Sequence, residues 1–213
     1  MSGAGVRMVL VAPERLAGWF ERFATSHGGA EVSAGALSVE ARASDGSVVH
    51  CEVPFPPLSA DPPDPWQALV DHALDHRRFG VLLIRRGGYA AGIFDAGELT
   101  VSKVGTRYVQ GRTAAGGQSQ QRFARRRDNQ AAALVGSAVE AAARILATEA
   151  GTLEALSTGG DRPLIAAALA DPRLSKLAAL PRGPWLDVGD PRQKTLIGAG
   201  ESARSVRITI TDG

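Results

Sequence analysis

The chain centres on the stretch Gly111-Arg-Thr-Ala-Ala-Gly-Gly-Gln-Ser-Gln-Gln-Arg-Phe-Ala-Arg-Arg-Arg127. The glycine pair Gly116 and Gly117 allows backbone conformations that other residues avoid, and it lets the main chain come close to a ligand. The amide side chain of Gln118 follows, and arginines dominate the rest of the stretch. We interpret it as a projecting loop that continues into a helix.

Strand-like segments precede this stretch and a long helical segment follows it. Residues 79–85, 89–94 and 98–109 read as strands, and the short turns between them favour antiparallel pairing. The alanine-rich segment after Ser119, which would serve as an N-cap, places apolar residues on one helical face as far as Leu146. The loop would therefore project from one end of a sheet.

The remainder of the C-terminal part alternates between strand and helix. We predict a strand over 152–157, a loop over 158–161, a helix that begins at Arg162-Pro163 and a short helical piece over 174–180. Further strands are predicted over 184–188 and 205–211. Strand–helix–strand units after an antiparallel hairpin indicate an α/β fold whose mixed sheet carries packed helices.

The N-terminal part has its own pattern. An amphipathic helix is predicted over 13–27 and a short β-hairpin or meander over 32–53. Residues 54–65 are too rich in proline for a helix or central strand, so we expect an extended linker. Asp64 and Pro65 then open a helix that continues to about Arg78. We therefore divide the chain into an N-terminal extension, 1–65, and a main domain, 66–213.

Composition and charge narrow the class of protein. The 213 residues are 44% hydrophobic and 22% charged, which is typical of a globular chain. The single cysteine excludes internal disulfides, and no run of apolar residues is long enough for a membrane span or signal peptide, so we expect a cytoplasmic protein.

Basic residues gather around the central stretch. No Asp or Glu occurs between Leu99 and Arg127, although a solvated helix face would ordinarily mix both signs of charge. This clustering is typical of a protein that binds a polyanion such as RNA. The candidate RNA-binding residues are Arg107, Arg112, Arg122, Arg125, Arg126 and Arg127.

Two histidines raise the question of a metal site. His72 and His76 stand four residues apart on a predicted helix, a spacing that suits zinc. No third or fourth ligand is evident in the sequence, so we interpret both as surface histidines and expect neither a metal nor a cofactor.

The chemistry of the loop follows from its glutamine. An amide donates and accepts hydrogen bonds but carries no titratable proton, so it is a poor general base. It suits a site that positions water while backbone N–H groups stabilise a developing oxyanion. A helix that begins at Ser119 would add its positive N-terminal end beside Gln118.

The block from Gly116 to Arg127 resembles the glycine-glycine-glutamine loop and following helix of the eukaryotic and archaeal class I translation release factors. The likeness covers about residues 79–191 and includes the hairpin strands, Tyr108-Val109 and the segment 157–161. It implies the fold of their catalytic middle domain, a mixed sheet flanked by helices and similar to ribonuclease H. The chain is also similar to stand-alone, actinobacterial Vms-like peptidyl-tRNA hydrolases of ribosome rescue.

The resemblance implies a function and site residues. The protein would hydrolyse the peptidyl-tRNA ester in the peptidyl-transferase centre of the large ribosomal subunit, acting as a monomer on stalled ribosomes. Gly116 and Gly117 would shape the tip, and Gln118 would coordinate the water. In the Vms-like relatives the key glutamine follows a serine, so Gln120 competes with Gln118, which we favour. The six candidate arginines named above would contact ribosomal RNA or tRNA.

Two other functions remain open at this point. An endonuclease could cut the tRNA acceptor end and release the peptide on a nucleotide stub, as the related eukaryotic hydrolase suggests. Alternatively, the arginine-rich helix could serve a non-catalytic module that binds the ribosome or another structured RNA.

Overall fold

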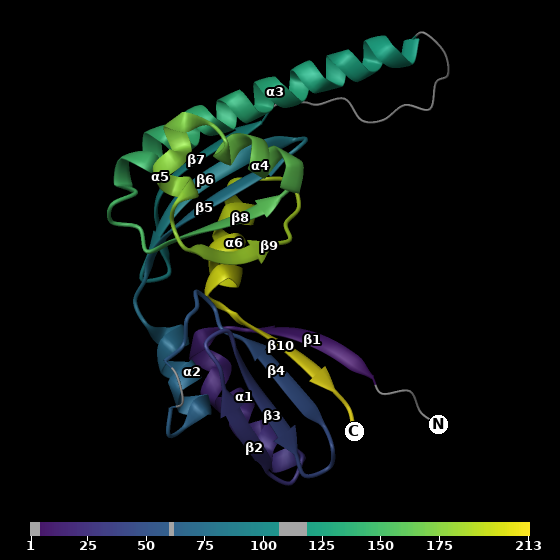
Figure 1. The fold of residues 1–213 in the computed structure, drawn as a ribbon, viewed down its shortest axis with the longest axis vertical. Helices are drawn as coiled ribbons and strands as arrows, with labels where there is room; N and C mark the ends of the chain where they lie inside the picture. Colours follow the sequence, from purple (N-terminus) through teal and green to yellow (C-terminus); the bar gives the residue numbers. More distant parts are fainter. Residues whose placement is uncertain (1–4, 60–61, 107–118) are drawn as a thin grey trace. The chain divides into compact units, whose positions relative to one another are not determined.

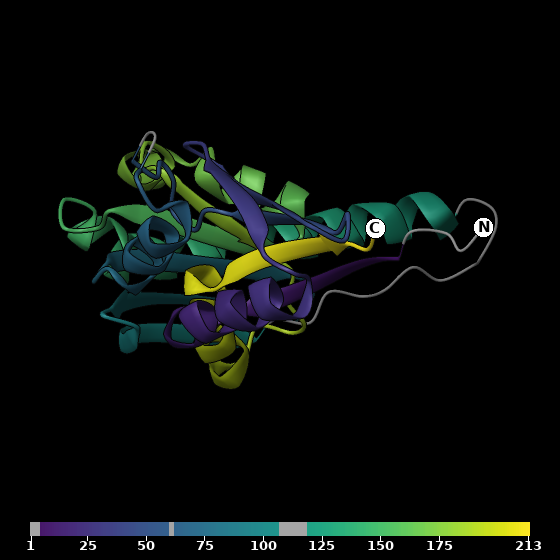
Figure 2. The same cartoon turned by 90° about the horizontal axis from the view of Figure 1, so that it is seen from below.

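The computed structural model describes residues 5–59, 62–106 and 119–213; in the first turns of the helix that begins at residue 119, only the side chains of Arg125 and Arg126 are described before residue 128. Internal contacts divide the chain into two compact units. Unit 1 consists of Met1–His76 with Glu201–Gly213, and unit 2 of Arg77–Gly200. Figures 1 and 2 show the helices and strands of each unit.

Unit 1 is built on an antiparallel sheet with the strand order β1-β10-β4-β3-β2. Its strands are β1 (Val6–Val11), β2 (Ala30–Ala34), β3 (Ser38–Ala43), β4 (Val48–Glu52) and β10 (Val206–Thr211). Helices α1 (Pro13–Ser26) and α2 (Pro65–Leu74) pack their apolar residues against one face of this sheet. The alternation of buried and partly exposed residues along β10 shows that its second face is not part of this core.

Most of the predicted N-terminal elements are present. The helix over 13–27 is confirmed as α1, the meander over 32–53 as β2 to β4, and the cap as Asp64, whose side chain accepts hydrogen bonds from the N–H groups of Trp66 and Gln67 at 3.1 Å and 3.0 Å. The predicted end of α2 at Arg78 is wrong, because the helix ends at Leu74 and Arg78 already begins the next strand. Strand β1 was not predicted from the sequence.

Unit 2 contains a mixed sheet, which confirms the predicted α/β class. Its order is β7-β6-β5-β8-β9, where β6 is antiparallel to both β5 and β7, and β8 is parallel to both β5 and β9. The strands are β5 (Arg78–Arg85), β6 (Gly88–Asp95), β7 (Glu98–Thr106), β8 (Ala155–Gly160) and β9 (Arg182–Leu186). The helices are α3 (Ser119–Ile145), α4 (Arg162–Leu169), α5 (Ser175–Ala178) and α6 (Gln193–Arg204), with short 3₁₀ turns η1 (Ala147–Glu149) and η2 (Pro172–Leu174).

Helices cover the sheet of unit 2 on both faces. The C-terminal half of α3 packs with α4 and α5 against Leu82, Ile84 and Ile93 (Figure 1). On the other face Leu196 of α6 lies over Gly92, and Gly200 of the same helix lies against the ring of Phe94. A side chain at Gly200 would collide with that ring, so the close approach of α6 requires glycine.

One sequence-based prediction for unit 2 needs correction, and one helix was missed. The strand predicted over 152–157 is Ala155–Gly160, so Thr158, Gly159 and Gly160 belong to the sheet and not to a loop. Glycine is unfavourable for a strand on propensity grounds, but here a Cβ at Gly159 would collide with Leu186 of β9. Helix α6 was missed, because Gly198 and Gly200 weaken its helical pattern.

The two compact units do not have the same boundaries as the two domains predicted from the sequence, which divide after residue 65. Helix α2 packs in the core of unit 1, and β10 is hydrogen-bonded between β1 and β4. The division at residue 65 stays a prediction about where the main functional domain begins.

Among the described residues, one helical segment, Asp128–Glu149, has the length and composition that would allow a membrane crossing. Its large apolar residues Leu134 and Leu146 are fully buried against the sheet of unit 2. The segment therefore serves as a core helix of this unit.

Candidate functional site

The central stretch of the sequence follows strand β7 at one end of the sheet in unit 2. Strands β5, β7, β8 and β9 run in the same direction, so the C-terminal ends of all four lie at this end of the sheet. Thr106 at the end of β7 pairs with Gly88, which pairs with Arg85 at the end of β5. Residues 107–118 therefore continue from the same edge at which β5, β8 and β9 end.

The last residues of β7 are fixed by a close cross-strand contact. The ring of Tyr89 lies across Gly105, its partner in the register, and a side chain at Gly105 would collide with that ring. A side chain at Gly88 would likewise collide with the carbonyl oxygen of Gly105. Tyr89 itself is 9% exposed and belongs to the core under α3. These contacts hold the point of departure of the central stretch rigidly against the sheet.

Basic and aromatic side chains follow the same edge. An Arg85 side-chain N–H donates to the carbonyl oxygen of Val188, so this guanidinium is held at the surface. The guanidinium carbon of Arg162, the first residue of α4, lies 4.0 Å from the centre of the Trp185 ring. Arginine stacked in this way keeps its charge and its donors available while its position is fixed. None of these residues was recognised as a site residue from the sequence.

Helix α3 carries the arginines that follow the central stretch. Its 27 residues correspond to a length of about 40 Å at 1.5 Å per residue. Full burial begins only at Leu134, so the preceding turns extend beyond the core of unit 2 (Figure 1). Arg125 and Arg126 are exposed there, and no ion pair joins either to another described residue. The charged side chains described on these turns are the two arginines and one exposed acid, Asp128, so their described net charge is positive.

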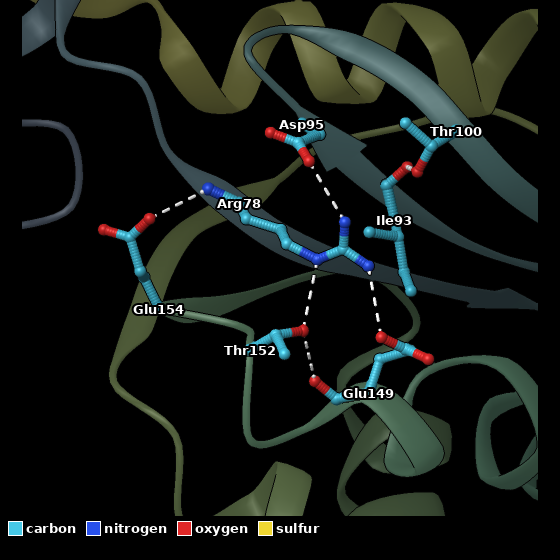
Figure 3. A network of polar contacts seen from close by, with 7 residues as sticks. All are labelled: Arg78, Ile93, Asp95, Thr100, Glu149, Thr152 and Glu154. Carbon is cyan, nitrogen blue, oxygen red and sulfur yellow. Dashed lines mark hydrogen bonds and ion pairs between the residues drawn. The ribbon is translucent and has the colours of Figure 1, made fainter.

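A polar cluster fixes the opposite end of α3 and the opposite edge of the sheet (Figure 3). The Arg78 guanidinium donates to Asp95 at 3.0 Å and to Glu149 at 3.2 Å, and its Nε donates to Thr152 at 3.1 Å. The backbone N–H of Arg78 donates to Glu154 at 2.9 Å. This cluster connects β5 and β6 with the turn that follows α3, so it anchors the helix at its C-terminal end.

The structure places the predicted site residues only in part. Gly116, Gly117, Gln118, Arg107 and Arg112 lie outside the described residues. For Gln120, Arg122 and Arg127 only the backbone is described, within α3; the first two lie in its first turns. Which glutamine acts therefore stays a prediction, as do the contacts of these arginines.

The histidine pair does not share a helical face. His72 lies on α2, where its Nε2 is 2.9 Å from the carbonyl oxygen of Pro54, to which it donates. His76 follows the end of that helix at Leu74. Within the described parts of the chain, no three His, Cys, Asp or Glu side chains come together in a way that could hold a metal ion.

Comparison with known protein families shows to which family this chain belongs. The profile of the family described as "Actinobacteria/chloroflexi VLRF1 release factor" matches residues 77–209, more than half of the chain. The chain belongs to this family. VLRF1 membership confirms the resemblance to release factors drawn from the residues around Gly116, and it implies a role at the ribosome.

The comparison with solved structures gives a distant likeness. The crystal structure of an archaeal translation termination factor, aRF1, is 13% identical with a TM-score of 0.43, and the match covers 93% of this chain. This VLRF1 chain spans 66% of the archaeal chain, and a likeness this low supports no argument about function. The comparison with curated proteins found no match.

Proposed function

We propose that this protein is a peptidyl-tRNA hydrolase that acts on stalled ribosomes. Membership in the VLRF1 release-factor family supports a ribosomal role, and the matched segment contains the whole of the Gly-Gly-Gln stretch and α3. The observation that carries the proposal is the setting of this stretch, which continues from a rigid strand end and enters a helix whose first turns extend beyond the core.

The setting suits catalysis by positioning. A glutamine amide orients the attacking water, and backbone N–H groups stabilise the negative charge that develops on the carbonyl oxygen of the ester. No side chain has to abstract the proton, so the rate depends on how firmly the tip is held. The Tyr89 ring across Gly105 and the Arg78 cluster support the two flanking elements, β7 and α3. We assign the water to Gln118 and keep Gln120 as the competing residue.

The arginines would deliver the tip to its substrate. Guanidinium groups bind phosphates with paired hydrogen bonds, and the turns of α3 before Leu134 are about 20 Å long, sufficient to enter a crevice of ribosomal RNA. Arg125 and Arg126 are free of ion pairs to other described residues, so they need not exchange one partner for another. We propose the peptidyl-transferase centre, ribosomal RNA and the tRNA acceptor end as the contacts. We also propose that the protein works as a cytoplasmic monomer, and that unit 2 has a ribonuclease H-like core.

The test is peptide release from stalled ribosomal complexes. Gln118→Ala should lower the rate at least about hundredfold, which is typical for loss of a positioning group, while Gln121→Ala serves as the matched glutamine control. If Gln120 is the active residue, Gln120→Ala gives the loss instead. Full activity in both Gln118→Ala and Gln120→Ala would refute the mechanism.

The 3′ end of the released tRNA separates ester hydrolysis from cleavage of the acceptor end. An intact CCA end is expected, whereas a shortened end would favour an endonuclease.

Salt dependence tests the role of the arginines. Arg125→Ala should lower the slope of log affinity against log salt by about one if Arg125 contacts a phosphate, and Arg144→Ala, exposed near the buried end of α3, should leave it unchanged. Binding that persists without any turnover would favour the non-catalytic module.

A further inference from the structure

Strand β1 leaves one edge of the sheet in unit 1 open. It pairs with β10 and with no other described strand. The carbonyl oxygen of Gly5 accepts a hydrogen bond from the N–H of Asp212 at 3.1 Å, in the register that continues from Val6 opposite Thr211. Hydrogen-bonded pairs alternate along an antiparallel ladder. The residues bonded to β10 are therefore Arg7, Val9 and Val11, and the N–H and C=O groups of Val6, Met8 and Leu10 point to the open edge.

The same three residues expose large apolar side chains. Val6 is 68% exposed, Met8 65% and Leu10 48%. They alternate with the residues that face α1, so their side chains lie together on the other face of the sheet. Natural edge strands are usually short or protected by proline or lysine. The six residues of β1 include neither, and their one charged residue, Arg7, lines the cavity on the helix-covered face. The apolar face at this edge is therefore open to another strand.

A groove runs beside β1 on the helix-covered face. Two adjoining cavities of about 630 Å³ and 220 Å³ share Val9, Trp19 and Arg22 as lining residues. Helix α1 contributes a ridge of side chains spaced three and four residues apart, Arg15, Trp19, Arg22 and Ser26. The cavities thus extend along α1 next to the strand.

The groove carries unpaired positive charge. Arg7, Arg15 and Arg22 are exposed, and none makes an ion pair with another described residue. Two acids line the larger cavity: Glu14, which is bound to Arg204 at 2.8 Å, and Glu201. Three arginines therefore face one carboxylate that has no ion pair with another described residue. The groove therefore offers arginine side chains to an acidic partner. These arginines lie beside the N–H and C=O groups of β1 that have no strand partner among the described residues.

We propose that the open edge of β1 binds an extended segment of a partner protein by β-strand addition. The segment would alternate apolar and acidic side chains, because successive residues of a strand face opposite sides. Its apolar residues would pack on Val6, Met8 and Leu10, and its acidic residues would face Arg7, Arg15 and Arg22. This surface lies in unit 1, outside the central stretch, and is independent of the proposed hydrolase activity.

Two other occupants fit less well. A second copy could pair Met8 with its own equivalent, but this pairing would bring two sets of the same arginines together, and like charges repel. A single-stranded RNA would satisfy the arginines with phosphates. It would leave the edge N–H and C=O groups without a matching ladder, and the exposed aliphatic side chains without apolar contact.

The test uses the full-length protein and a fluorescent synthetic peptide of about ten residues that alternates valine and glutamate, long enough to span β1. Met8→Pro removes an N–H that faces the open edge and leaves the bonds to β10 in place, so the fold should persist. Loss of that donor and the added ring should weaken peptide binding about tenfold or more in fluorescence anisotropy. Circular dichroism checks that the variant is folded.

Charge variants make the test independent of Met8→Pro. Arg22→Glu should weaken binding about tenfold at low salt, and less at high salt because surface charges are screened. Arg42→Glu, an exposed arginine on β3, is the matched control and should leave the affinity unchanged. A peptide that carries lysine in place of glutamate should bind at least about tenfold more weakly than the acidic peptide.

Several outcomes would overturn the proposal. Undiminished peptide binding by both Met8→Pro and Arg22→Glu would show that the edge and the groove are not involved. Binding of a single-stranded RNA oligonucleotide that Arg22→Glu abolishes, without binding of the acidic peptide, would assign the groove to RNA. A dimer in analytical ultracentrifugation that Met8→Pro dissociates would assign the edge to a second copy.

Discussion

Replacing Arg78 by methionine removes the centre of the polar cluster at the C-terminal end of α3. Methionine keeps a long stem but loses the donors to Asp95, Thr152 and Glu149. The backbone N–H still donates to Glu154. The variant therefore isolates the contribution of the guanidinium.

The magnitude follows from exposure. The Arg78 side chain is 29% exposed, and its partners Asp95 and Glu149 are 48% and 46% exposed, so water screens both ion pairs. We assign about 0.5 kcal/mol to each ion pair and about 1 kcal/mol to the bond with Thr152, which lowers the free energy of unfolding by about 2 kcal/mol. For a chain of this size the melting temperature should fall by about 4–8 °C.

Thermal unfolding followed by circular dichroism measures this change. Arg144→Met is the matched control. Arg144 is exposed near the C-terminal end of α3, the helix that the cluster anchors, and it forms no ion pair with another described residue. A melting temperature of Arg78→Met within about 1 °C of both the parent and the control would refute the anchoring role of the cluster, since even one lost hydrogen bond should exceed that shift.

Three further predictions concern single positions. Gly105→Ala should destabilise the fold by about 1–3 kcal/mol in urea unfolding because its Cβ would collide with the Tyr89 ring, and Tyr89→Ala in the same chain should cancel most of the effect of adding that methyl group. Burial raises the pKa of the Cys51 thiol to about 12, so a thiol reagent at pH 8 should label it only after unfolding, and rapid labelling of the folded protein would contradict this placement. The Ser47 N–H that donates to Asp45 holds the pKa of this carboxyl at about 2, below its unfolded value of about 4, so its contribution to stability is present above pH 4 and is lost as the pH falls towards 2. Asp45→Asn should flatten the acid dependence of the free energy of unfolding in that range, and an unchanged pH profile would show that the carboxyl does not contribute.

Much of the local structure could be predicted from the sequence, because the signals are local. The three adjacent strands β5, β6 and β7 follow from apolar runs separated by short turns. The cap at Asp64 follows from a side chain that satisfies free backbone N–H groups. The start of α4 at Arg162-Pro163 follows from a proline in the first turn, where its missing N–H has no helical partner to lose. In each case the evidence lies within a few residues of the element that it predicts.

Two of the errors have a shared cause. Residues 158–160 look like a loop because glycine disfavours strands, yet Gly159 lies in a strand because Leu186 of β9 leaves no room for a side chain. Helix α6 looks weak for the same reason, although Gly200 is needed where the ring of Phe94 comes close. Both glycines are required by steric contact with residues that are distant in the sequence, so no local pattern predicts the requirement.

The candidate site divides in the same way. The Gly-Gly-Gln stretch and the arginines around it are visible in the sequence, since their chemistry depends on residue type and spacing. The stacked pair of Arg162 and Trp185, and the Arg78 cluster, join residues from separate strands and helices. Such sets can be recognised only once the register of β5, β8 and β9 is known.

The sequence by itself determined the family resemblance, the α/β class and the position of the Gly-Gly-Gln stretch between a strand and a long helix. These features depend on side-chain chemistry and on periodicities of a few residues. The tertiary structure decided the partners of each strand. It placed β10 beside β1 and β4, and it left one edge of β1 open. A strand carries the same hydrogen-bonding groups on both edges, so only the arrangement of the whole sheet determines which groups are already paired and which can bind a partner.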